Sequence, residues 1–530
     1  MENNQLNSPN NFEGEGQHKD SNFQRNIQIN PDFSNILPPD NKITPEIIRG
    51  GVKKLLEPSE TANHSDILHQ LLEQIEPVNF REIVYNENGN NVTNTENLKL
   101  FNKHYLVESI NQIGKIAKRN KWALCVNNGF IYLYNGAYWK VIGEEEFKIF
   151  LGEAAEKMKV PKYDAQLYDF RDKLLKQFYA TQFLPRPEYN NDIVLINLKN
   201  GTFEINLKEE KLRPFDRADF LTYQLPFEYD PDAKAPMFEA FLNRVLPDNE
   251  SQKVLAEFIG YLFIRNGSKR LKAEKVLVLY GSGANGKSVF YEIIKAMLGK
   301  ENVSSYPIQQ LTDKSGYYGA EIVNKIVNYS SEISINLETS IFKQMASGED
   351  ISVRSPYGRP FNTNQYAKLI FNCNQLPKDV EHTNAYFRRF IIIPFNVTIP
   401  ENEQDPNLHT KIIENELPGV FNWALEGLRR LLKQGRFTEC TAVRKAVEQY
   451  KIESSSVQMF LNENGYTKST TERKLLGEFY TEYRNYSTEN GYKPFQKNNF
   501  SKQLRELGYF VERGTAGATY VYVESSFNPF

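Results

Sequence analysis

A glycine-rich stretch in the middle of the chain, Gly281-Ser-Gly-Ala-Asn-Gly-Lys-Ser288, has residues and spacing suited to holding phosphate. Gly281, Gly283 and Gly286 have the G-x-G-x-x-G spacing of dinucleotide-binding loops. The whole stretch also has the G-x-x-x-x-G-K-S spacing of the P-loop of nucleoside triphosphatases. The two patterns predict different chemistries, because the first binds a dinucleotide and the second binds a triphosphate.

The segments on either side of the stretch favour the triphosphate interpretation. Lys275–Tyr280 is a compact apolar run typical of a buried parallel strand, and Ser288–Leu298 has its apolar residues on one helical face before Gly299. The loop is thus predicted to join a strand to a helix, whereas the glycine loop of a protein kinase is followed by a strand. A dinucleotide site also requires an acidic residue at the end of the second strand, but Glu301 precedes the next plausible strand.

In the triphosphate interpretation each special residue of the loop has a task. Backbone N–H groups of the loop and of the helix N-terminus would surround the phosphates of ATP. Lys287 would reach the outer phosphates, and the Ser288 hydroxyl would ligate Mg²⁺. The dinucleotide pattern explains neither residue, and the remaining alternative is a glycine turn followed by a chance Lys-Ser pair. The predicted ATP-binding residues are Gly281, Ser282, Gly283, Ala284, Asn285, Gly286, Lys287 and Ser288.

Three later segments place polar residues beside apolar strands, as a triphosphatase requires. The run Ile326-Val-Asn-Tyr-Ser-Ser-Glu332 ends in a carboxylate that could hold Mg²⁺ indirectly and polarise the attacking water. A second apolar run ends at Asn374, which could orient a water near the γ-phosphate. Arg388 and Arg389 precede a third apolar run. The guanidinium group of either residue could neutralise charge in the transition state. Each segment alone also fits a solvated strand end, a turn, or arginines that bridge a helix and a strand.

Together and in this order, these segments resemble the superfamily 3 helicases, specifically the phage and plasmid primase-helicase group related to the poxvirus primase-helicase. The resemblance runs from about residue 100 to the C-terminus, and the combination of motifs is specific although the single motifs are not. It is carried by Gly281–Ser288, the strand that ends in Glu332, Lys343–Ile351, Asn374–Pro377, the Arg388-Arg389 pair before Pro394-Phe395, and, upstream, Asn197–Thr202, Tyr229–Pro231 and Phe258–Tyr261.

The resemblance implies an AAA+-type motor that assembles as a ring, a homo-hexamer in this group, with ATP between subunits. It also implies travel along one DNA strand in the 3′ to 5′ direction, which the residues themselves do not indicate. The residues implied as catalytic are Lys287, Glu332 and Asn374 in one subunit and Arg388 or Arg389 in its neighbour.

The predicted metal site departs from the pattern of the family. Its ligands would be Ser288 and Glu332. Many members of the superfamily have two successive acids at the second position, but here Ser331 precedes Glu332. A single carboxylate would therefore serve both the metal ion and the attacking water.

A short segment after these motifs falls where the family has a hairpin that enters the channel of the ring. The segment is Ile351–Phe361, and its candidate DNA contacts are Arg354, Tyr357 and Arg359. Guanidinium groups suit phosphate, and an aromatic ring suits stacking on a base or sugar. An ordinary surface turn would explain the proline and glycine of this segment equally well.

The composition is that of a globular protein with no general affinity for nucleic acid. The chain has 530 residues, a formal net charge of −2 and a sequence pI near 6.4, so nucleic-acid binding must come from local patches. No apolar run is long enough for a membrane span, and the first residues lack a signal pattern, so a cytoplasmic location and no membrane partner are expected. The three cysteines are widely separated and predict neither a disulfide framework nor a metal knuckle.

The pattern along the chain predicts an α/β multidomain protein with a P-loop AAA+-type core, an α/β N-terminal domain and a C-terminal winged-helix-like domain. Asn135-Gly136 between apolar runs predicts a hairpin over 129–142, and a second hairpin is predicted over 192–205. The predicted parts are a disordered polar tail (1–42), a small helical segment with a linker beginning at Tyr85 (43–97), the N-terminal domain (98–270), the ATPase core (271–400), a helical segment with one helix over 418–432 (401–455) and the winged-helix-like domain (456–530).

The last part of the chain has the outline of a winged helix. A helix over 472–486, a second helix ending before Gly508, and strands over 509–513 and 519–523 are predicted in that order. Basic residues gather there, consistent with phosphate contacts at a replication origin, although the solvated face of a protein-interaction domain is about equally consistent. The candidate DNA contacts are Lys497, Lys502 and Arg505, with Lys493 and Arg513 nearby.

The leading hypothesis is an ATP-dependent DNA helicase that acts on single-stranded and forked DNA during replication of a phage, plasmid or other mobile element. Its further partners would be origin DNA and other replication proteins. A separate primase would be among them, because no primase domain is expected in this chain. One alternative is an initiator or helicase loader that uses ATP to assemble on an origin without processive unwinding. Another is a small-molecule kinase, which leaves Asn374 and the hairpin segment unexplained.

Overall fold

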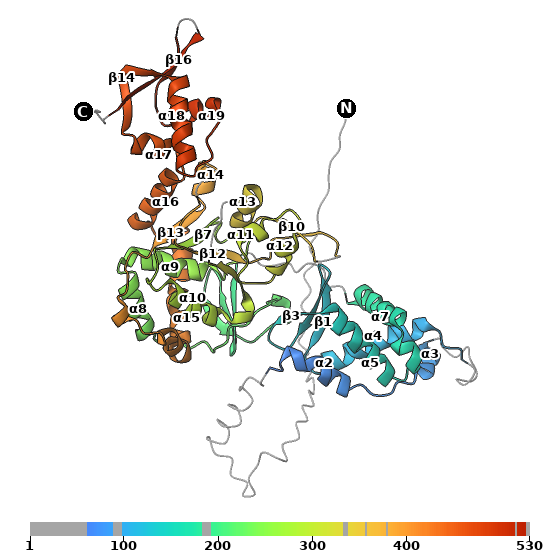
Figure 1. Ribbon diagram of the computed structural model, residues 1–530. Coiled ribbons are helices and arrows are strands. Elements are labelled where there is room, and N and C mark those ends of the chain that lie inside the picture. The colour runs from blue at the N-terminus through green and yellow to red at the C-terminus, as the bar shows by residue number, and fades with distance from the viewer. Residues whose placement is uncertain are drawn as a thin grey trace, which may run out of the picture. The chain divides into compact units, whose positions relative to one another are not determined.

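The computed structural model describes residues 61–87, 98–182, 192–331, 338–355, 358–377, 380–514 and 517–525 (Figure 1). Several predictions concern residues outside these ranges. They are the polar tail over 1–42, most of the linker up to residue 97, Glu332 and Tyr357. The described chain is mixed α/β, contains a parallel sheet and is organised around several separate hydrophobic cores.

The first described part, residues 61–182, is a group of helices beside a three-stranded antiparallel sheet. The predicted hairpin at Asn135-Gly136 is confirmed, with Tyr134 of β2 paired to Trp139 of β3. An additional strand, β1, pairs with β2 on the other side. The elements are α2 (His64–Glu73), α3 (Phe80–Glu87), α4 (Asn102–Arg119), β1 (Ala123–Asn127), β2 (Phe130–Tyr134), β3 (Trp139–Ile142), α5 (Glu144–Lys157), α6 (Lys162–Gln166) and α7 (Tyr168–Thr181).

Helix α2 belongs to the same core as the helices that follow the predicted linker. Ile67 and Leu71 of α2 are buried with Ile110 of α4 and Leu151 of α5. Tyr85, the predicted first residue of the linker, lies inside α3. The packing therefore does not divide at residue 97, because the apolar face of α2 has its partners in α4 and α5.

The second hairpin is also confirmed and leads toward the central sheet. Strands β4 (Val194–Leu198) and β5 (Gly201–Ile205) are antiparallel, and β6 (Glu210–Arg213) pairs with β5. The 3-10 turn η2 (Arg217–Asp219) follows. The region predicted as helical from residue 237 forms two helices, α8 (Pro236–Val245) and α9 (Asn249–Tyr261).

The central sheet has five parallel strands in the order β13-β7-β12-β9-β8. Leu277 and Leu279 of β7 face one core, and Val276 and Val278 face another, as the two-residue period of a strand requires. The sheet is thus buried on both faces, which explains the continuous apolar runs in the sequence. Its strands are β7 (Val276–Tyr280), β8 (Val303–Ser304), β9 (Val327–Ser330), β12 (Lys368–Cys373) and β13 (Phe390–Pro394).

Helices cover both faces of the central sheet (Figure 1). The first face packs against α8, α9, α10 (Lys287–Leu298) and α15 (Leu408–Gln434). The second packs against α11 (Ile308–Leu311), α13 (Thr339–Ser347), α14 (Asn384–Phe387) and α16 (Thr441–Glu453). The remaining elements of this region are η3 (Lys300–Asn302), α12 (Tyr317–Glu321), β10 (Ile351–Val353), β11 (Phe361–Thr363) and η4 (Glu401–Glu403).

Helix α15 is longer than predicted. It also caps the amino end of α8. It was expected to begin at Pro418, but it begins ten residues earlier and contains that proline inside. Ile412, in the earlier part, is fully buried, and burial of this apolar face outweighs the local cost of the proline. The buried carboxylate of Glu416 accepts hydrogen bonds from the backbone N–H groups of Met237 and Phe238, both at 2.9 Å. It therefore caps the first turn of α8.

Helices α9 and α15 approach closely because small residues lie between them. A Cβ atom added at Gly427 of α15 would lie 2.2 Å from the carbonyl carbon of Ala256 in α9. A Cβ atom added at Gly260 of α9 would lie 2.7 Å from the backbone nitrogen of Leu428. Only glycine fits at either position without moving a helix backbone.

We expect Gly427→Ala to lower the free energy of unfolding by about 1–3 kcal/mol, because the two helices must separate to admit the methyl group. Chemical denaturation followed by circular dichroism measures the shift in midpoint. Gly114→Ala is the matched control, since Gly114 lies inside α4 and its added Cβ would meet nothing within 4 Å. The control should be neutral or stabilising by up to about 1 kcal/mol. Equal midpoints for the two variants would contradict the close approach.

The C-terminal part differs from the predicted outline at its start. The residues from 472 to 475, expected to begin a helix, belong to β14 and pair with β16, so that Arg473 lies opposite Tyr522. Helix α18 begins only at Leu476, because the local helical pattern yields to this antiparallel pairing. The elements are α17 (Ser456–Glu463), β14 (Tyr466–Leu475), α18 (Leu476–Glu489), α19 (Lys497–Glu506), β15 (Val511–Arg513) and β16 (Thr519–Ser525), with sheet order β14-β16-β15.

Candidate functional site

The glycine loop over 281–286 joins the carboxyl end of β7 to the amino end of α10. Strand β7 lies between β12 and β13. The strands that follow β7 in the chain, β8, β9 and β12, all lie on one side of it, and β13 lies on the other side. Ligands of open parallel sheets bind at such a reversal, outside the carboxyl ends of the strands. The loop therefore occupies the position where a ligand is expected.

Two glycines allow the loop to fold tightly on itself. An added Cβ at Gly281 would lie 2.2 Å from Nδ2 of Asn285, which donates a hydrogen bond to the backbone oxygen of Phe395 at 3.0 Å. Gly286 has φ +83°, and an added Cβ there would lie 2.7 Å from Val245 of α8. The loop is thus held by the segment after β13 on one side and by α8 on the other.

Lys287 is folded back on the glycine loop. Its side chain is buried, and Nζ donates to the backbone oxygen of Gly281 at 2.7 Å and to Oδ1 of Asn285 at 2.9 Å. Burial lowers the pKa of this ammonium group, because desolvation disfavours the charged form and both acceptors are neutral. An anionic group in the loop would be a stronger partner for the ammonium than the two neutral oxygens.

A cavity of about 760 Å³ opens beside the loop. Its walls include the loop residues from Gly283, Lys287 and the exposed Ser288. Asn374 also lines it, and so do Ser331 and Asn372 at the carboxyl ends of β9 and β12. Cavities that hold small-molecule ligands measure about 300–1,000 Å³, so this volume suits a nucleotide. Glu332 lies outside the described residues.

Asn372 is a lining residue that the sequence did not single out. It lies in β12, two positions before Asn374, which follows the strand, and both residues line the cavity. Its Oδ1 accepts a hydrogen bond from the Tyr329 hydroxyl at 3.1 Å. The two-residue spacing was the available signal. Phe241, Arg244, Ile399 and Leu408 complete the cavity from distant parts of the chain, and no local pattern marked them.

The two predicted catalytic arginines lie in different surroundings. The Arg389 side chain is buried and donates from Nη2 to Oγ of Ser347 at 2.9 Å. The Arg388 side chain is 59% exposed and forms an ion pair with Glu274 at 2.7 Å. Arg389 is thus committed to packing beneath α13, whereas Arg388 is accessible from outside the chain.

Arg388 does not belong to the cavity beside the glycine loop. It precedes Phe390, which pairs with Val276 at the amino end of β7, whereas the loop follows Tyr280 at the carboxyl end. At about 3.3 Å per strand residue the two ends of β7 are roughly 13 Å apart. The structure therefore does not bring Arg388 together with Lys287 in one chain.

The predicted hairpin is present, and its two arginines differ. Strands β10 and β11 are antiparallel. Arg359 is exposed between them, whereas Arg354 donates from Nε to the backbone oxygen of Ser315 at 3.1 Å and lies over the ring of Tyr317 at 4.6 Å. Arg354 is thus held against α12 rather than extended, and Tyr357 lies outside the described residues.

The basic residues predicted as DNA contacts in the C-terminal part lie on one helix. Lys497, Lys502 and Arg505 all belong to α19 and are exposed, while Phe500 and Leu504 of the same helix are buried. Lys502 and Arg505 are three residues apart and share a helical face. The Lys502 ammonium lies 3.8 Å from Glu506, so part of its charge is balanced locally.

Two family models match parts of the chain. Residues 99–247 match a family described as D5 N terminal like. Residues 279–389 match a family of unknown function, DUF5906. The second match begins in β7 and ends at Arg389, so it contains the glycine loop, the hairpin and both arginines.

Three curated viral proteins are similar to parts of this chain. "Putative helicase L207/L206" of Acanthamoeba polyphaga mimivirus is 28% identical over 276 residues, covering 48% of this chain and 27% of that protein. "Putative helicase 184R" of Invertebrate iridescent virus 6 is 24% identical over 237 residues, covering 40% and 23%. "Putative helicase 121R" of Invertebrate iridescent virus 3 is 25% identical over 248 residues, covering 42% and 25%. The matched segments thus amount to about a quarter of the length of these relatives.

Among solved structures, the apo structure of the NrS-1 C terminal region in its A form is similar at 11% sequence identity. The match covers 77% of this chain and 97% of that chain, with a TM-score of 0.44. A further apo structure of the same region, residues 305–718, gives 12% identity and a TM-score of 0.43.

Within the described ranges, no helix combines the length and the apolar character needed to cross a bilayer. The same ranges contain no group of three or more His, Cys, Asp or Glu side chains arranged to hold a metal ion. Any metal ion at the glycine loop would depend on Ser288, on the bound ligand and on residues such as Glu332 that are not described.

Proposed function

We propose that this protein is an ATP-dependent replicative DNA helicase of a phage, plasmid or other mobile element, viruses included. The observation that carries the proposal is the convergence of the glycine loop, Lys287, Ser288 and Asn374 on one cavity at the carboxyl end of the central sheet. The similarity to three viral proteins named as helicases supports the same activity for this chain.

The residues around the cavity fit a nucleoside triphosphate. Loop N–H groups and the amino end of α10 favour phosphate, and the Lys287 ammonium exchanges its neutral acceptors for phosphate oxygens. Phe241, Ile399 and Leu408 supply an apolar wall for the base. The carboxylates that also line the cavity suit ribose hydroxyls; they belong to Glu401, Glu403 and Asp405. Mg²⁺, held by Ser288 and Glu332, would neutralise charge on the phosphates. Asn374 would orient the attacking water.

The proposal includes a ring in which the active site is completed by a neighbouring subunit. Arg388 is exposed and lies at the opposite end of the sheet from its own glycine loop. A second copy of the chain can present it to that loop, where a guanidinium stabilises the transition state. Arg389, buried against Ser347, positions the strand instead. We propose a homo-hexamer, with DNA threaded past the β10–β11 hairpins and travel from 3′ to 5′.

The test is ATP hydrolysis and forked-duplex unwinding measured in one preparation of the protein. We expect hydrolysis to rise when single-stranded DNA is added and the strands to separate only with hydrolysable ATP. DNA binding and hydrolysis without strand separation would favour the initiator or loader, in which the basic face of α19 binds an origin. Turnover indifferent to DNA would favour a small-molecule kinase and contradict the proposal.

A further inference from the structure

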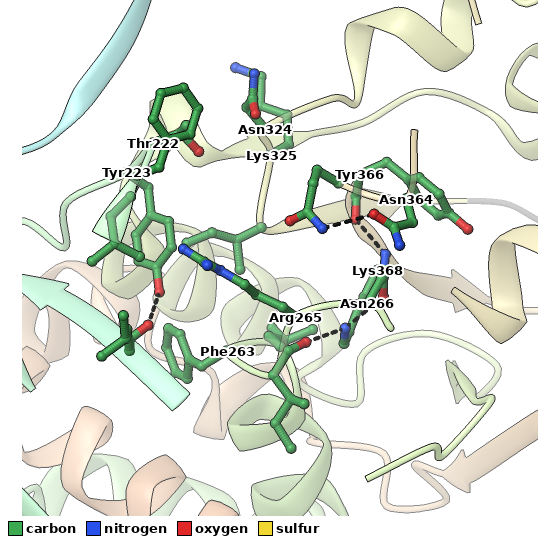
Figure 2. Close-up of a pocket in the computed structure, with 17 residues that line it drawn as sticks. Thr222, Tyr223, Phe263, Arg265, Asn266, Asn324, Lys325, Asn364, Tyr366 and Lys368 are labelled. Atoms are coloured by element: carbon green, nitrogen blue, oxygen red, sulfur yellow. Dashed lines mark hydrogen bonds between the residues drawn. The ribbon is translucent and has the colours of Figure 1, made fainter. Parts of the chain in front are cut away.

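A second cavity lies at the end of the central sheet opposite to the glycine loop (Figure 2). Its volume is about 80 Å³, and its walls come mainly from residues 220–223, 262–266, 324–326 and 364–368. Ile326 directly precedes β9, and Lys368 is the first residue of β12. The cavity is therefore at the amino ends of the strands whose carboxyl ends meet the proposed nucleotide site.

The lining of this cavity is cationic. Arg265, Lys325 and Lys368 belong to it, and the described residues that line it include no aspartate or glutamate. The other polar lining residues are amides and hydroxyls, among them Thr222 and Asn266. The Lys325 ammonium donates to the backbone oxygen of Glu301 at 2.6 Å, and its charge is offset by the nearby carboxylates of Glu301 and Glu321. Arg265 and Lys368 thus carry the charge that faces the cavity.

Lys368 is a buried cation without a carboxylate partner. Its side chain is 7% exposed, and Nζ donates to the backbone oxygen of Ile264 at 2.6 Å and to Oδ1 of Asn266 at 3.0 Å. The ring of Tyr261 lies 4.3 Å away. Within the described part of the chain, the Lys368 ammonium forms no ion pair with a carboxylate. Burial lowers the pKa of Lys368 to about 7. An isolated buried ammonium is costly, and an anion beside it removes much of that cost.

Arg265 supplies the second cationic group. Its Nη2 donates to the backbone oxygen of Asp219 at 2.8 Å. A guanidinium carries five N–H donors in a planar fork that matches the oxygens of phosphate. In Figure 2 the Arg265 side chain extends toward Tyr223, while Lys368 lies on the other side of the pocket beside Asn266.

We propose that this cavity binds a phosphate group between the Arg265 guanidinium and the Lys368 ammonium. A single water requires about 10–15 Å³ of such volume, so 80 Å³ holds several waters or one tetrahedral oxyanion. The cavity beside the glycine loop has a volume of about 760 Å³. The second cavity, at about 80 Å³, is too small for a whole nucleotide. The phosphate is either free inorganic phosphate or a phosphodiester of bound nucleic acid. This site is independent of the proposed nucleotide site.

Isothermal titration with inorganic phosphate at constant ionic strength tests the proposal. The full chain is used with Lys287→Ala, because that substitution weakens phosphate binding at the glycine loop. We expect one binding site, weakened roughly ten-fold or more by Lys368→Met and by Arg265→Gln, since each removes a charge-assisted hydrogen bond. Lys173→Gln, at an exposed position of α7, is the control and should bind phosphate as its parent does.

The two variants make the outcome decisive. Lys368→Met keeps most of the length of the side chain and removes the ammonium group. If this variant fails to fold, Arg265→Gln alone gives the answer. Phosphate binding that neither variant weakens, or no binding in the Lys287→Ala background, would overturn the proposal. Displacement of phosphate by a single-stranded oligonucleotide would identify the phosphodiester as its source, and failure of displacement would identify free phosphate. Loss of ATP binding on Lys287→Ala tests the nucleotide site separately.

Discussion

Lys287→Ala should lower the rate of ATP hydrolysis by two to three orders of magnitude and abolish unwinding, without changing the fold. Removing one preorganised charged donor from a transition state typically costs a factor of about 10²–10³. The hydrogen bonds of the Lys287 ammonium go to Gly281 and Asn285, two residues of its own loop. The contacts of the loop with Phe395, Ile399 and α8 do not involve the lysine.

The matched control for this prediction is on the same helix. Lys295→Ala removes a lysine from α10 whose ammonium lies 5.1 Å from the ring of Tyr291 and 3.7 Å from a Glu292 carboxylate oxygen. It changes the charge of the protein equally and should leave hydrolysis within about two-fold of wild type. The steady-state rate and the midpoint of thermal unfolding are measured for both variants. Equal rates for Lys287→Ala and wild type would exclude the glycine loop as the site of hydrolysis.

Arg388→Ala should reduce hydrolysis by roughly 10³-fold, the effect expected when a trans-acting guanidinium is removed. The fold should be retained, because the Arg388 side chain is 59% exposed and Glu274 keeps Lys272 as an ion-pair partner at 3.0 Å. Arg389→Ala should instead lower the unfolding midpoint, because Ser347 loses its hydrogen-bond donor and the buried guanidinium leaves a cavity. Hydrolysis rates and unfolding midpoints for the two variants separate these roles.

Mixing subunits tests whether Arg388 acts across an interface. Inactive Lys287→Ala and inactive Arg388→Ala chains, combined in equal amounts, should recover part of the hydrolysis, because some interfaces then contain an intact loop and an intact arginine. Glu274→Gln is the control for the ion pair within the chain, and it should keep most activity. No recovery on mixing, together with recovery when Arg389→Ala replaces Arg388→Ala, would move the role to Arg389.

The sequence predicted those parts of the site that depend on neighbours along the chain. The strand, glycine loop and helix around Lys287 are local, and their period changes at Gly286 from that of a strand to that of a helix. The hairpins at Asn135-Gly136 and over 192–205 also follow from local turn residues. The Arg388-Arg389 pair was found for the same reason. The sequence could not show which of the two is buried, because that depends on the contacts with Ser347 and Glu274.

What the sequence did not predict depends on contacts between distant segments. β14 is a strand because β16, about fifty residues later, pairs with it, and its own residues resemble the start of a helix. α15 continues through Pro418 because Ile412 is buried against the core. The cationic cavity is assembled from five separate segments of the chain. In the sequence Lys368 is only the charged first residue of an apolar run.

The support of the glycine loop by α8 limits how small a working fragment of this protein can be. α8 contacts the loop at Gly286, and its own first turn is capped by Glu416 of α15. The core that contains these helices extends from Val194 to Cys440. A fragment cut at residues 271 and 400 would keep every motif of the proposed motor, yet it would expose the back of the loop to solvent.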